Sequence, residues 1–339
     1  DKSHNQKRPV TCGAFSFWPS RKKRVALVAV PCNVWPMTEQ KSISARAWGE
    51  LLLLALIWGG VFLSVRIALN EIGVLSAVAH RALWAALVLW GLVFVLRLPR
   101  PKGARLWGVF LVMGLLNNVV PFTLLNWSQL HIESGLTAIL NSTTAICGVV
   151  VASLFLADER LTPRKLAGVL IGFLGVATAI GLSNLLNFDI RSLAQIAALT
   201  ATVSYAFAGV WARKHLTALH PLVAAAGMLT CTALFIVPLA WLFEGPLTLD
   251  LRAETLAAIA YYALAATVLA YLLYYRVLAM AGSGNLMLVT LLMPPVAIVL
   301  GWAVLGEALP PRALMGFAIL ALGLLILDGR ALAWLRNRV

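Results

Sequence analysis

The chain has 339 residues, of which 61% are hydrophobic and only 12% are charged, whereas soluble globular proteins average about 45–50% apolar and about 25% charged residues. This composition excludes an ordinary soluble domain and predicts a polytopic membrane protein in a lipid bilayer. The formal net charge of +14 would favour nucleic acid as the partner of a soluble protein. Here the Lys and Arg residues lie in short breaks between apolar runs, so they report topology and we expect no nucleic-acid partner.

Residues 1–46 differ from the rest, because they are basic and show no sustained amphipathic period. The apolar patch 25–32 is too short to span a bilayer. It resembles a signal peptide only in part, since Pro31 and Pro36 interrupt it and no clear cleavage site follows. Met37 opens a polar stretch that leads into the first apolar run. The sequence therefore predicts a disordered leader over residues 1–46.

After Trp48 the chain contains ten apolar runs, each near the roughly 20 residues that a helix needs to cross a bilayer. No run alternates as a membrane β-strand does, so we predict an all-α polytopic protein with ten transmembrane helices. The runs are 49–69, 75–96, 106–126, 135–157, 164–183, 193–212, 221–243, 254–275, 284–305 and 313–329.

The chain contains one unit twice, because the stretch 134–181 returns in altered form as 283–329. From the Glu of each copy onward the shift is constant, since 307 − 159 = 148. We expect a first repeat over 47–183, a second over 190–330 and a basic cytoplasmic tail over 331–339. The coinciding pairs include Glu159/Glu307, Pro163/Pro311, Arg164/Arg312, Gly168/Gly316, Gly175/Gly323 and Gly181/Gly329.

The distribution of Lys and Arg predicts the orientation of the helices. Counted from Met37 with the N-terminus inside, the outer loops hold only Arg191, Arg252 and Arg312. The inner segments hold fifteen such residues: Lys41, Arg46, Arg97, Arg100, Lys102, Arg105, Arg160, Arg164, Lys165, Arg213, Lys214, Arg276, Arg330, Arg336 and Arg338. Both termini are therefore predicted to be cytoplasmic.

Five helices per repeat is an odd number, so the second repeat must cross the membrane in the opposite sense to the first. Inverted repeats of this kind are a known transporter architecture, with the substrate site near the midplane. Glu159 and Lys165 are then expected inside, and Glu133 and Glu307 outside.

A family resemblance rests on Trp58-Gly59-Gly60, on Arg81 and on the Glu-x-Leu-x-Pro-Arg junctions at Glu159 and Glu307, each followed by a glycine-rich run. Over residues 48–329 the chain resembles the EamA-like branch of the drug/metabolite transporter superfamily. The resemblance implies two inverted five-helix repeats around a central cavity, and export of amino acids, other metabolites or drugs. It implies a cavity lined mainly by the runs 49–69, 106–126, 135–157, 193–212, 254–275 and 284–305.

The sequence departs from that family in one place. Pro294-Pro295 interrupt the 284–305 run, as is frequent in such transporters, whereas the 135–157 run has Thr143-Thr144-Ala145 at the matching place. A symmetrical bend in the first repeat is therefore without sequence support.

No enzyme signature appears. The thirteen carboxylates fall in the leader, in loops or near helix ends, which removes paired-carboxylate catalysis and a proton-relay acid inside the bilayer. There is no phosphate-binding glycine loop, His-x-x-x-His pair or serine nucleophile elbow. The four cysteines lie far apart, without the spacing of a zinc site. We expect no catalytic residue, no metal and no cofactor.

The 135–157 run carries the most informative polar surface, because Thr137, Asn141, Thr144 and Gly148 share one helical face. This stripe either makes interhelical hydrogen bonds, worth about 0.6–2 kcal/mol each, or lines a cavity. Asn141 favours the cavity, since an amide with four hydrogen-bonding sites is hard to satisfy in a packed interface. Asn141 and Thr144 are candidate substrate-binding residues.

Asn117 and Asn118 are further candidates. They precede Pro121, whose missing amide proton frees a backbone carbonyl. The two amides either cap that distortion or face the substrate.

Three aromatic residues, Trp58, Tyr205 and Tyr271, complete the candidate set. A buried phenol needs a partner for its hydroxyl, so these residues either complete packing or line a pathway. Arg81 lies about two turns into the 75–96 run. An arginine near a helix end usually extends to the headgroups, which we favour over a role in binding an anionic substrate.

These features predict a secondary transporter of the plasma (inner) membrane that exports a small organic metabolite, such as an amino acid, or a drug-like solute by alternating access. A passive channel or a membrane scaffold is the alternative, and a membrane-embedded enzyme is a weaker one. A channel would need a ring of charge or carbonyls along a pore, which the sequence lacks. Gly168-x-x-x-Gly172 and Gly175 are expected to permit close helix packing, and a homodimer through this face is left open.

Overall fold

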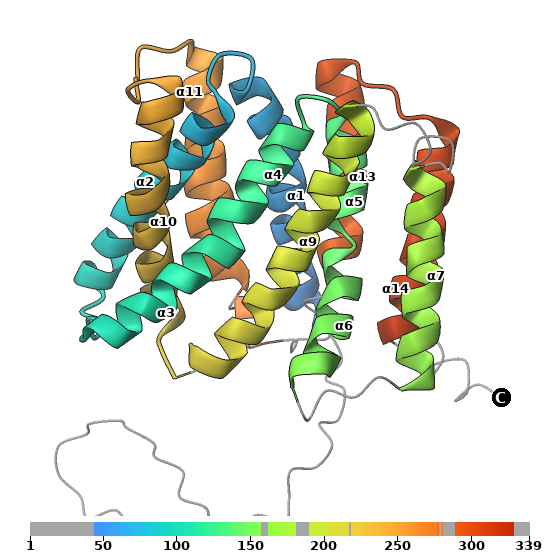
Figure 1. Cartoon of the computed structure of the whole chain (residues 1–339), viewed down its shortest axis with the longest axis horizontal. Helices are drawn as coiled ribbons and strands as arrows, with labels where there is room; N and C mark the ends of the chain where they lie inside the picture. Colours follow the sequence, from blue (N-terminus) through green and yellow to red (C-terminus); the bar gives the residue numbers. More distant parts are fainter. Residues whose placement is uncertain are drawn as a thin grey trace, which may run out of the picture. The chain divides into compact units, whose positions relative to one another are not determined.

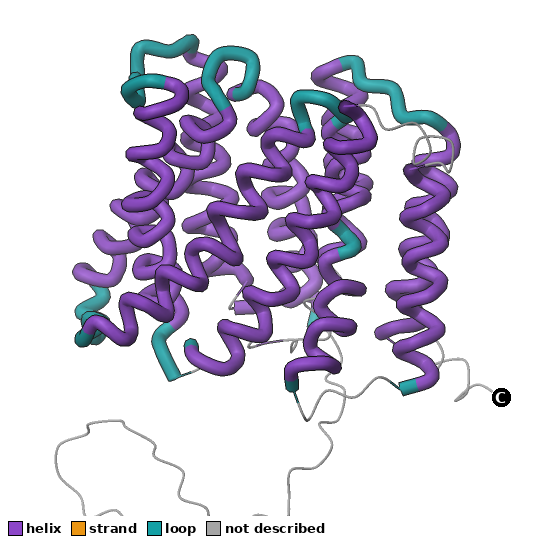
Figure 2. Tube along the Cα trace, viewed as in Figure 1, coloured by secondary structure: helices purple, strands orange, loops and turns teal. Residues whose placement is uncertain are grey.

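The computed structural model describes residues 44–156, 162–180, 190–216, 218–274, 276–277, 280 and 289–328. The tail, the junction at Glu159 and most of the predicted leader lie outside these residues. Within them the regular structure is helical and no strand is found (Figure 1, Figure 2). The elements are α1 Ala45–Ala68, α2 Val74–Val95, α3 Ala104–Gly114, η1 Leu115–Val119, α4 Val120–Ser128, α5 Ser134–Asn141, α6 Thr144–Phe155, α7 Pro163–Ile180, α9 Ile190–His215, α10 Pro221–Glu244, α11 Ala253–Ala260, η2 Tyr261–Leu269, α13 Val289–Leu305 and α14 Pro311–Asp328, where η marks a π-helix.

Seven described helical segments are long and apolar enough to cross a membrane: Ala45–Ala68, Val74–Val95, Ala104–Ser128, Ser134–Phe155, Ile190–His215, Pro221–Glu244 and Ala253–Tyr274. Two shorter apolar stretches follow, 292–305 and 311–326. Large apolar side chains on these helices, including Leu154, Leu242 and Trp302, remain more than two-thirds exposed. Water would penalise so much exposed apolar surface. The chain is therefore an all-helical, multi-pass membrane protein, as its composition predicts.

Local sequence signals account for several helix ends. The Ser44 hydroxyl accepts a hydrogen bond from the Ala47 amide at the start of α1, as expected for an N-terminal cap. Pro221 and Pro311 open α10 and α14, where a missing amide proton costs nothing. Gly245 ends α10 with a φ of 98°, a conformation that glycine adopts without strain.

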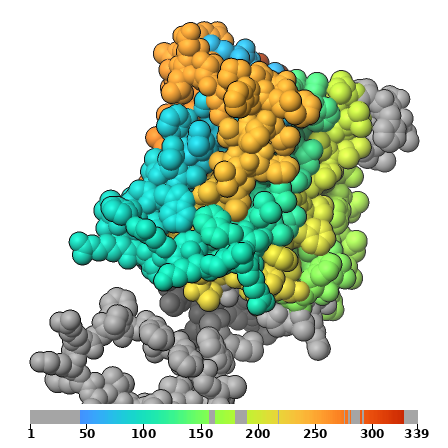
Figure 3. Space-filling model, turned by 60° about the vertical axis from the view of Figure 1, so that its left-hand side comes forward, coloured from blue at the N-terminus to red at the C-terminus, as the bar shows by residue number. Residues whose placement is uncertain are grey.

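The largest helix–helix interfaces join the first half of the chain to the second. α7 packs on α14, α2 on α10, α1 on α13, and α4 and α6 both pack on α9. Figure 1 shows the α7–α14 pair, and Figure 3 shows the surface of α2 and α3 beside that of α10. The core is therefore built between the halves.

The α7–α14 interface is made by glycines from both helices. A β-carbon on Gly175 would lie 2.8 Å from the Gly316 carbonyl oxygen, and one on Gly323 would lie 2.8 Å from the Gly168 carbonyl oxygen. The two helices thus approach backbone to backbone and run antiparallel. The glycine face of α7, which the sequence left open for a homodimer, is covered here by α14 of the same chain.

The helix of the 135–157 run is interrupted without a proline. α5 ends at Asn141 and α6 begins at Thr144, with a turn at Ser142-Thr143 between them. The hydroxyls of Ser142, Thr143 and Thr144 donate to the carbonyl oxygens of Ala138, Leu140 and Asn141 at 3.0, 2.7 and 2.7 Å. Side-chain hydroxyls can replace helix hydrogen bonds in this way. The first repeat is therefore interrupted although it has no proline at this place. In the second repeat, by contrast, Pro294 and Pro295 lie within the continuous helix α13.

Two π-helical segments interrupt corresponding helices of the two halves, η1 between α3 and α4 and η2 after α11. A π-helix leaves carbonyls without their usual partners, and such segments often occur at functional sites. In η1 the Leu116 carbonyl accepts from the Ser204 hydroxyl of α9 at 2.7 Å. In η2 the Tyr262 carbonyl accepts from the Thr267 hydroxyl at 2.8 Å.

Candidate functional site

Arg81 lies inside the helical bundle and does not extend to its end. The guanidinium sits over the Phe122 ring of α4, 3.9 Å from the ring centroid, and its Nε donates to the Thr267 hydroxyl of η2 at 3.0 Å. Arg81 is seven residues from the start of α2 and Thr267 is fourteen from the start of α11, or about 10 Å and about 20 Å along the helices. The side chain therefore points toward the middle of the bundle.

The expectation that Arg81 reaches the headgroups was wrong, and the packing explains why. Thr267 offers an acceptor because its hydroxyl proton is already donated to the Tyr262 carbonyl. Phe122 offers an aromatic face, which attracts a cation by about 0.5–2 kcal/mol. Both partners lie far from Arg81 in sequence, so only the fold brings them together.

Two predicted residues lie with Arg81. Tyr205 of α9 and Tyr271, which follows η2, interact with it electrostatically, as does Tyr262. Tyr271 also lies close to Asn117 of η1. We name Arg81, Asn117, Tyr205 and Tyr271 the arginine cluster.

The four members of the arginine cluster come from four helical segments and both halves of the chain. Each is only partly buried, although all belong to apolar helices that pack on one another. Partly buried polar side chains inside a membrane-spanning bundle are the arrangement expected of residues that contact a polar solute.

Asn118 and Trp58 lie outside the arginine cluster. Asn118 is fully buried and donates to the Thr232 hydroxyl of α10 at 3.0 Å. The Trp58 indole nitrogen donates to the Ala266 carbonyl at 3.1 Å, and its ring lies 6.0 Å from that of Tyr274. In this structure Asn118 lies in a packed interface, and Trp58 ties α1 to η2.

The helix break at Ser142-Thr143 presents the other two candidates. The Asn141 amide oxygen is buried and has no hydrogen-bond partner among the described residues, whereas the Thr144 hydroxyl is used by the Asn141 carbonyl. Thr143 contacts the Thr202 hydroxyl of α9 at 3.1 Å. Thr202 and Tyr205 are three residues apart and share a helical face, so the break and the arginine cluster adjoin the same side of α9.

Carboxylates join the two halves at one end of the bundle, the upper end in Figure 1. Each glutamate follows or ends a helix of one half and binds the start of a helix of the other half. The N-terminal end of a helix favours negative charge. We call these contacts the carboxylate links. They are Glu71 of the α1–α2 loop to the Arg252 amide and the Thr255 hydroxyl, Glu133 to Arg191 at 2.6 Å, Glu244 to the Leu75 and Ser76 amides at 2.9 and 2.7 Å, and Glu307 to the Ser134 amide and hydroxyl at 2.9 and 2.6 Å.

The Glu71 link depends on pH. The Thr255 hydrogen bond lowers the pKa of Glu71 below its ordinary value; burial opposes this effect, and the Arg252 amide and charge add to it. A lowered pKa means that the link contributes stability above the ordinary Glu range and loses it as pH falls through the lowered value.

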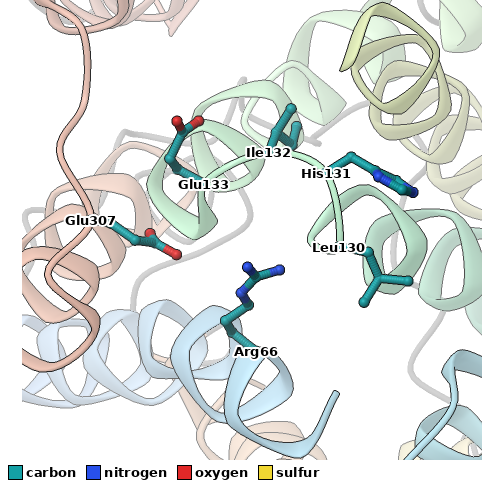
Figure 4. Close-up of a pocket in the computed structure, with 6 residues that line it drawn as sticks. All are labelled: Arg66, Leu130, His131, Ile132, Glu133 and Glu307. Atoms are coloured by element: carbon teal, nitrogen blue, oxygen red, sulfur yellow. The ribbon is translucent and has the colours of Figure 1, made fainter. Parts of the chain in front are cut away.

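A pocket of about 170 Å³ lies beside the Glu133 and Glu307 links (Figure 4). Arg66 enters it from α1 and donates to the Gln129 carbonyl. The pocket is polar, because Arg66 and the carboxylates of Glu133 and Glu307 are among its lining residues, and both carboxylates already have partners. Its lining residues are Arg66, Leu130, His131, Ile132, Glu133 and Glu307.

We expect Glu307→Gln to lower the stability of the folded protein by about 1 kcal/mol, because hydrogen bonds to a charged acceptor contribute about 1.5–3 kcal/mol and neutral ones about 0.5–1.5. Thermal unfolding in detergent measures the change. Asp250→Asn, an exposed carboxylate change near the same end, serves as the control. Equal melting of the two variants would mean that the Glu307 charge does not hold the halves together.

Sequence reasoning missed Arg81 as an interior residue, and it missed Thr267 and the carboxylate links. A local signal existed only for the Glu residues, which precede or end helices. Their partners are 58 to 184 residues away, beyond the range of any periodic pattern.

Comparison with known proteins identifies the family. The model of the EamA-like transporter family matches residues 47–181 and again 192–327. The chain is 26% identical over 290 residues to the "Probable terminal-alkyne amino-acid exporter" of Streptantibioticus cattleyicolor, covering 86% of this chain and 95% of that protein. It is 26% identical over 285 residues to Protein PecM of Dickeya dadantii, covering 84% and 92%.

A solved crystal structure of another protein superposes with a TM-score of 0.60 at 18% sequence identity, covering 84% of this chain and 97% of that one. At that identity the likeness supports the fold alone. With most of the sequence matched by the family model in two successive segments, the chain belongs to the EamA-like transporter family and is a multi-pass membrane transporter.

Proposed function

We propose that this transporter is a secondary carrier that exports a small organic solute, such as an amino acid, another metabolite or a drug-like compound, by alternating access. The arginine cluster carries the proposal, because it gathers partly buried polar groups from both halves of the chain inside the bundle. Asn141 and Thr144 at the helix break extend the proposed site, and Trp58 and Asn118 support it from neighbouring interfaces. A relative named as an amino-acid exporter supports the solute class.

The proposed architecture is ten transmembrane helices in two inverted five-helix repeats, 47–183 and 190–330. The glycine contacts of α7 and α14 support it. Gly168 and Gly316 occupy equivalent positions of the repeats, as do Gly175 and Gly323, and the contacts are reciprocal, Gly175 with Gly316 and Gly168 with Gly323. Reciprocal contacts of this kind are expected where a two-fold axis relates two units.

Two ion pairs at opposite ends of the bundle support alternating access. Glu133, after α4, pairs with Arg191 at the start of α9. Arg276, a helical residue that follows η2 in the chain, pairs with Glu50 near the start of α1. The first pair joins the end of the Ala104–Ser128 helix to the start of α9, and the second joins the end of the Ala253–Tyr274 helix to the start of α1. In both pairs the third helix of one repeat meets the first helix of the other repeat. In the proposed cycle these two contacts break in turn.

Counterflow in proteoliposomes tests the carrier. We expect vesicles preloaded with an exported solute to take up labelled solute faster than empty vesicles, because a carrier returns loaded faster than empty. Uptake that is linear in concentration and indifferent to preloading would mean a passive pore. The solute is identified beforehand, by comparing the metabolites released from cells with and without the protein.

The proposed orientation places both termini in the cytoplasm. A cysteine at Ala308, the exposed neighbour of Glu307, is therefore expected to react with an impermeant thiol reagent in intact cells, in a protein whose four native cysteines are replaced. A cysteine at Lys102 is expected to react only after permeabilisation. The reverse pattern would invert the proposed topology, and labelling of both from outside would contradict an odd number of helices per repeat.

A further inference from the structure

The Arg81 guanidinium is only partly satisfied by the protein. It has five N–H donors, and the one on Nε is directed to Thr267 while Phe122 covers one face. Among the described residues neither terminal nitrogen has a hydrogen-bond or ion-pair partner. These are the two nitrogens that form the parallel, bidentate contact with a carboxylate.

Within the described part of the chain, no carboxylate balances this charge. The described groups that interact electrostatically with Arg81 are the phenols of Tyr205, Tyr262 and Tyr271, all of which are neutral at physiological pH. A cation inside a membrane-spanning bundle is costly unless it is paired. The protein thus holds a positive charge in the bundle with its bidentate edge unused.

Neutral polar groups lie near the guanidinium. The Tyr262 hydroxyl is fully buried and has no hydrogen-bond partner among the described residues, and an unsatisfied buried hydroxyl is unfavourable. Asn117 and Tyr271 lie close to each other, and both side chains are only partly buried. The neighbourhood therefore combines one cation with hydroxyl and amide groups that can hydrogen-bond a solute.

We infer that Arg81 binds the carboxylate of the transported solute, so that the substrates of this protein are carboxylate-bearing organic solutes. This inference rests on the proposed carrier function and deepens it. Thr267 acts as a positioning residue, since its bond to Nε fixes the plane of the guanidinium. Tyr205, Tyr271 and Asn117 contact the remainder of the solute.

The first experiment compares the medium of cells that express the wild type with that of cells lacking the protein. We expect the exported solutes to carry a carboxylate. Exported solutes without any anionic group would overturn the inference and leave the carrier intact. If no solute differs and no counterflow occurs, the proposed function itself fails and the inference fails with it.

The second experiment uses the exported acid and its uncharged amide as competing probes in proteoliposomes. We expect the wild type to prefer the acid by roughly tenfold or more, the size expected for one charge-assisted bidentate contact, and Arg81→Gln to bring the ratio close to one. Arg81→Lys keeps the charge but lacks the two-pronged edge, so its ratio is expected between the two. The ratio does not depend on how much protein reaches the membrane, so it separates binding from folding.

Arg105→Gln is the matched control, because Arg105 is exposed at the start of α3 and has no hydrogen-bond or ion-pair partner for its side chain among the described residues. It is expected to keep the wild-type ratio. If Arg81→Gln lowers thermal stability yet retains the wild-type preference for the acid, Arg81 is a structural residue and the inference is wrong.

Discussion

Replacing Gly316 with valine is expected to abolish the folded protein. A β-carbon at this position would lie 2.3 Å from the Ala179 backbone nitrogen and 2.6 Å from its α-carbon. Backbone atoms cannot rotate away as a side chain can, so α7 and α14 would have to separate along their whole interface. Overpacking usually costs about 1–3 kcal/mol, and we expect at least about 3 kcal/mol here. The measurement is the monodisperse fraction after detergent extraction.

Gly316→Ala keeps the effect measurable if the valine variant cannot be isolated, because alanine already introduces the clashing atom. Gly91→Ala and Gly209→Ala are the controls, since no atom lies within 4 Å of a β-carbon at either site. These controls are expected to match or exceed wild-type stability, as alanine favours helix by up to about 1 kcal/mol.

A double variant tests the contact itself. Gly175→Ala and Gly316→Ala open the same interface, so their joint cost is expected to be smaller than the sum of the two single costs. Additive costs, or a Gly316→Ala variant as stable as the wild type, would contradict the backbone-to-backbone packing of α7 and α14.

Asn141→Leu is expected to reduce transport at least roughly tenfold while leaving the protein folded. The Asn141 amide oxygen has no hydrogen-bond partner among the described residues, so removing it breaks no hydrogen bond to them. Relieving an unsatisfied buried group is worth up to about 1–3 kcal/mol. We therefore expect a melting temperature equal to or above that of the wild type. Initial transport rates, normalised to protein in the membrane, give the second readout.

Thr200→Leu is the matched control, because Thr200 is an exposed polar residue of α9 whose hydroxyl donates to its own helix. It is expected to transport normally. Thr144→Val separates a structural role of the break from a role in solute binding. The Thr144 hydroxyl donates to the Asn141 carbonyl, and losing this hydrogen bond is expected to lower the stability of the protein by about 1 kcal/mol. Normal transport by both Asn141→Leu and Thr144→Val would remove the break from the proposed site.

The helical content was predictable from sequence because apolar runs of membrane-spanning length have few structural alternatives. Close helix packing at the glycines of α7 was also predictable, since small residues let backbones approach, but the sequence did not indicate that α14 is the partner. The break at Ser142-Thr143 was not expected, because hydroxyls can replace a proline and their effect depends on whether neighbouring helices accept the bend.

Contacts between the halves could not be read from the sequence. Arg81 and Thr267 are 186 residues apart, and nothing near either residue indicates the other. Arg81 looked like an arginine close to a helix end because periodic patterns give depth along a helix but not the direction of a side chain. The candidates Asn117, Tyr205 and Tyr271 were found because polar groups stand out in apolar runs, but their common neighbour was not.

In the proposed alternating-access cycle, the carboxylate links would also affect how long the halves stay together at that end of the bundle. Because each link bridges the halves separately, a rigid separation must break all of them in one event. Their free energies then add, so each link multiplies the lifetime of the closed arrangement by its own factor. A change of 1.4 kcal/mol alters such a lifetime by about tenfold. Substituting one glutamate at a time would therefore adjust the dwell time of the closed form in graded steps, with the arginine cluster left untouched.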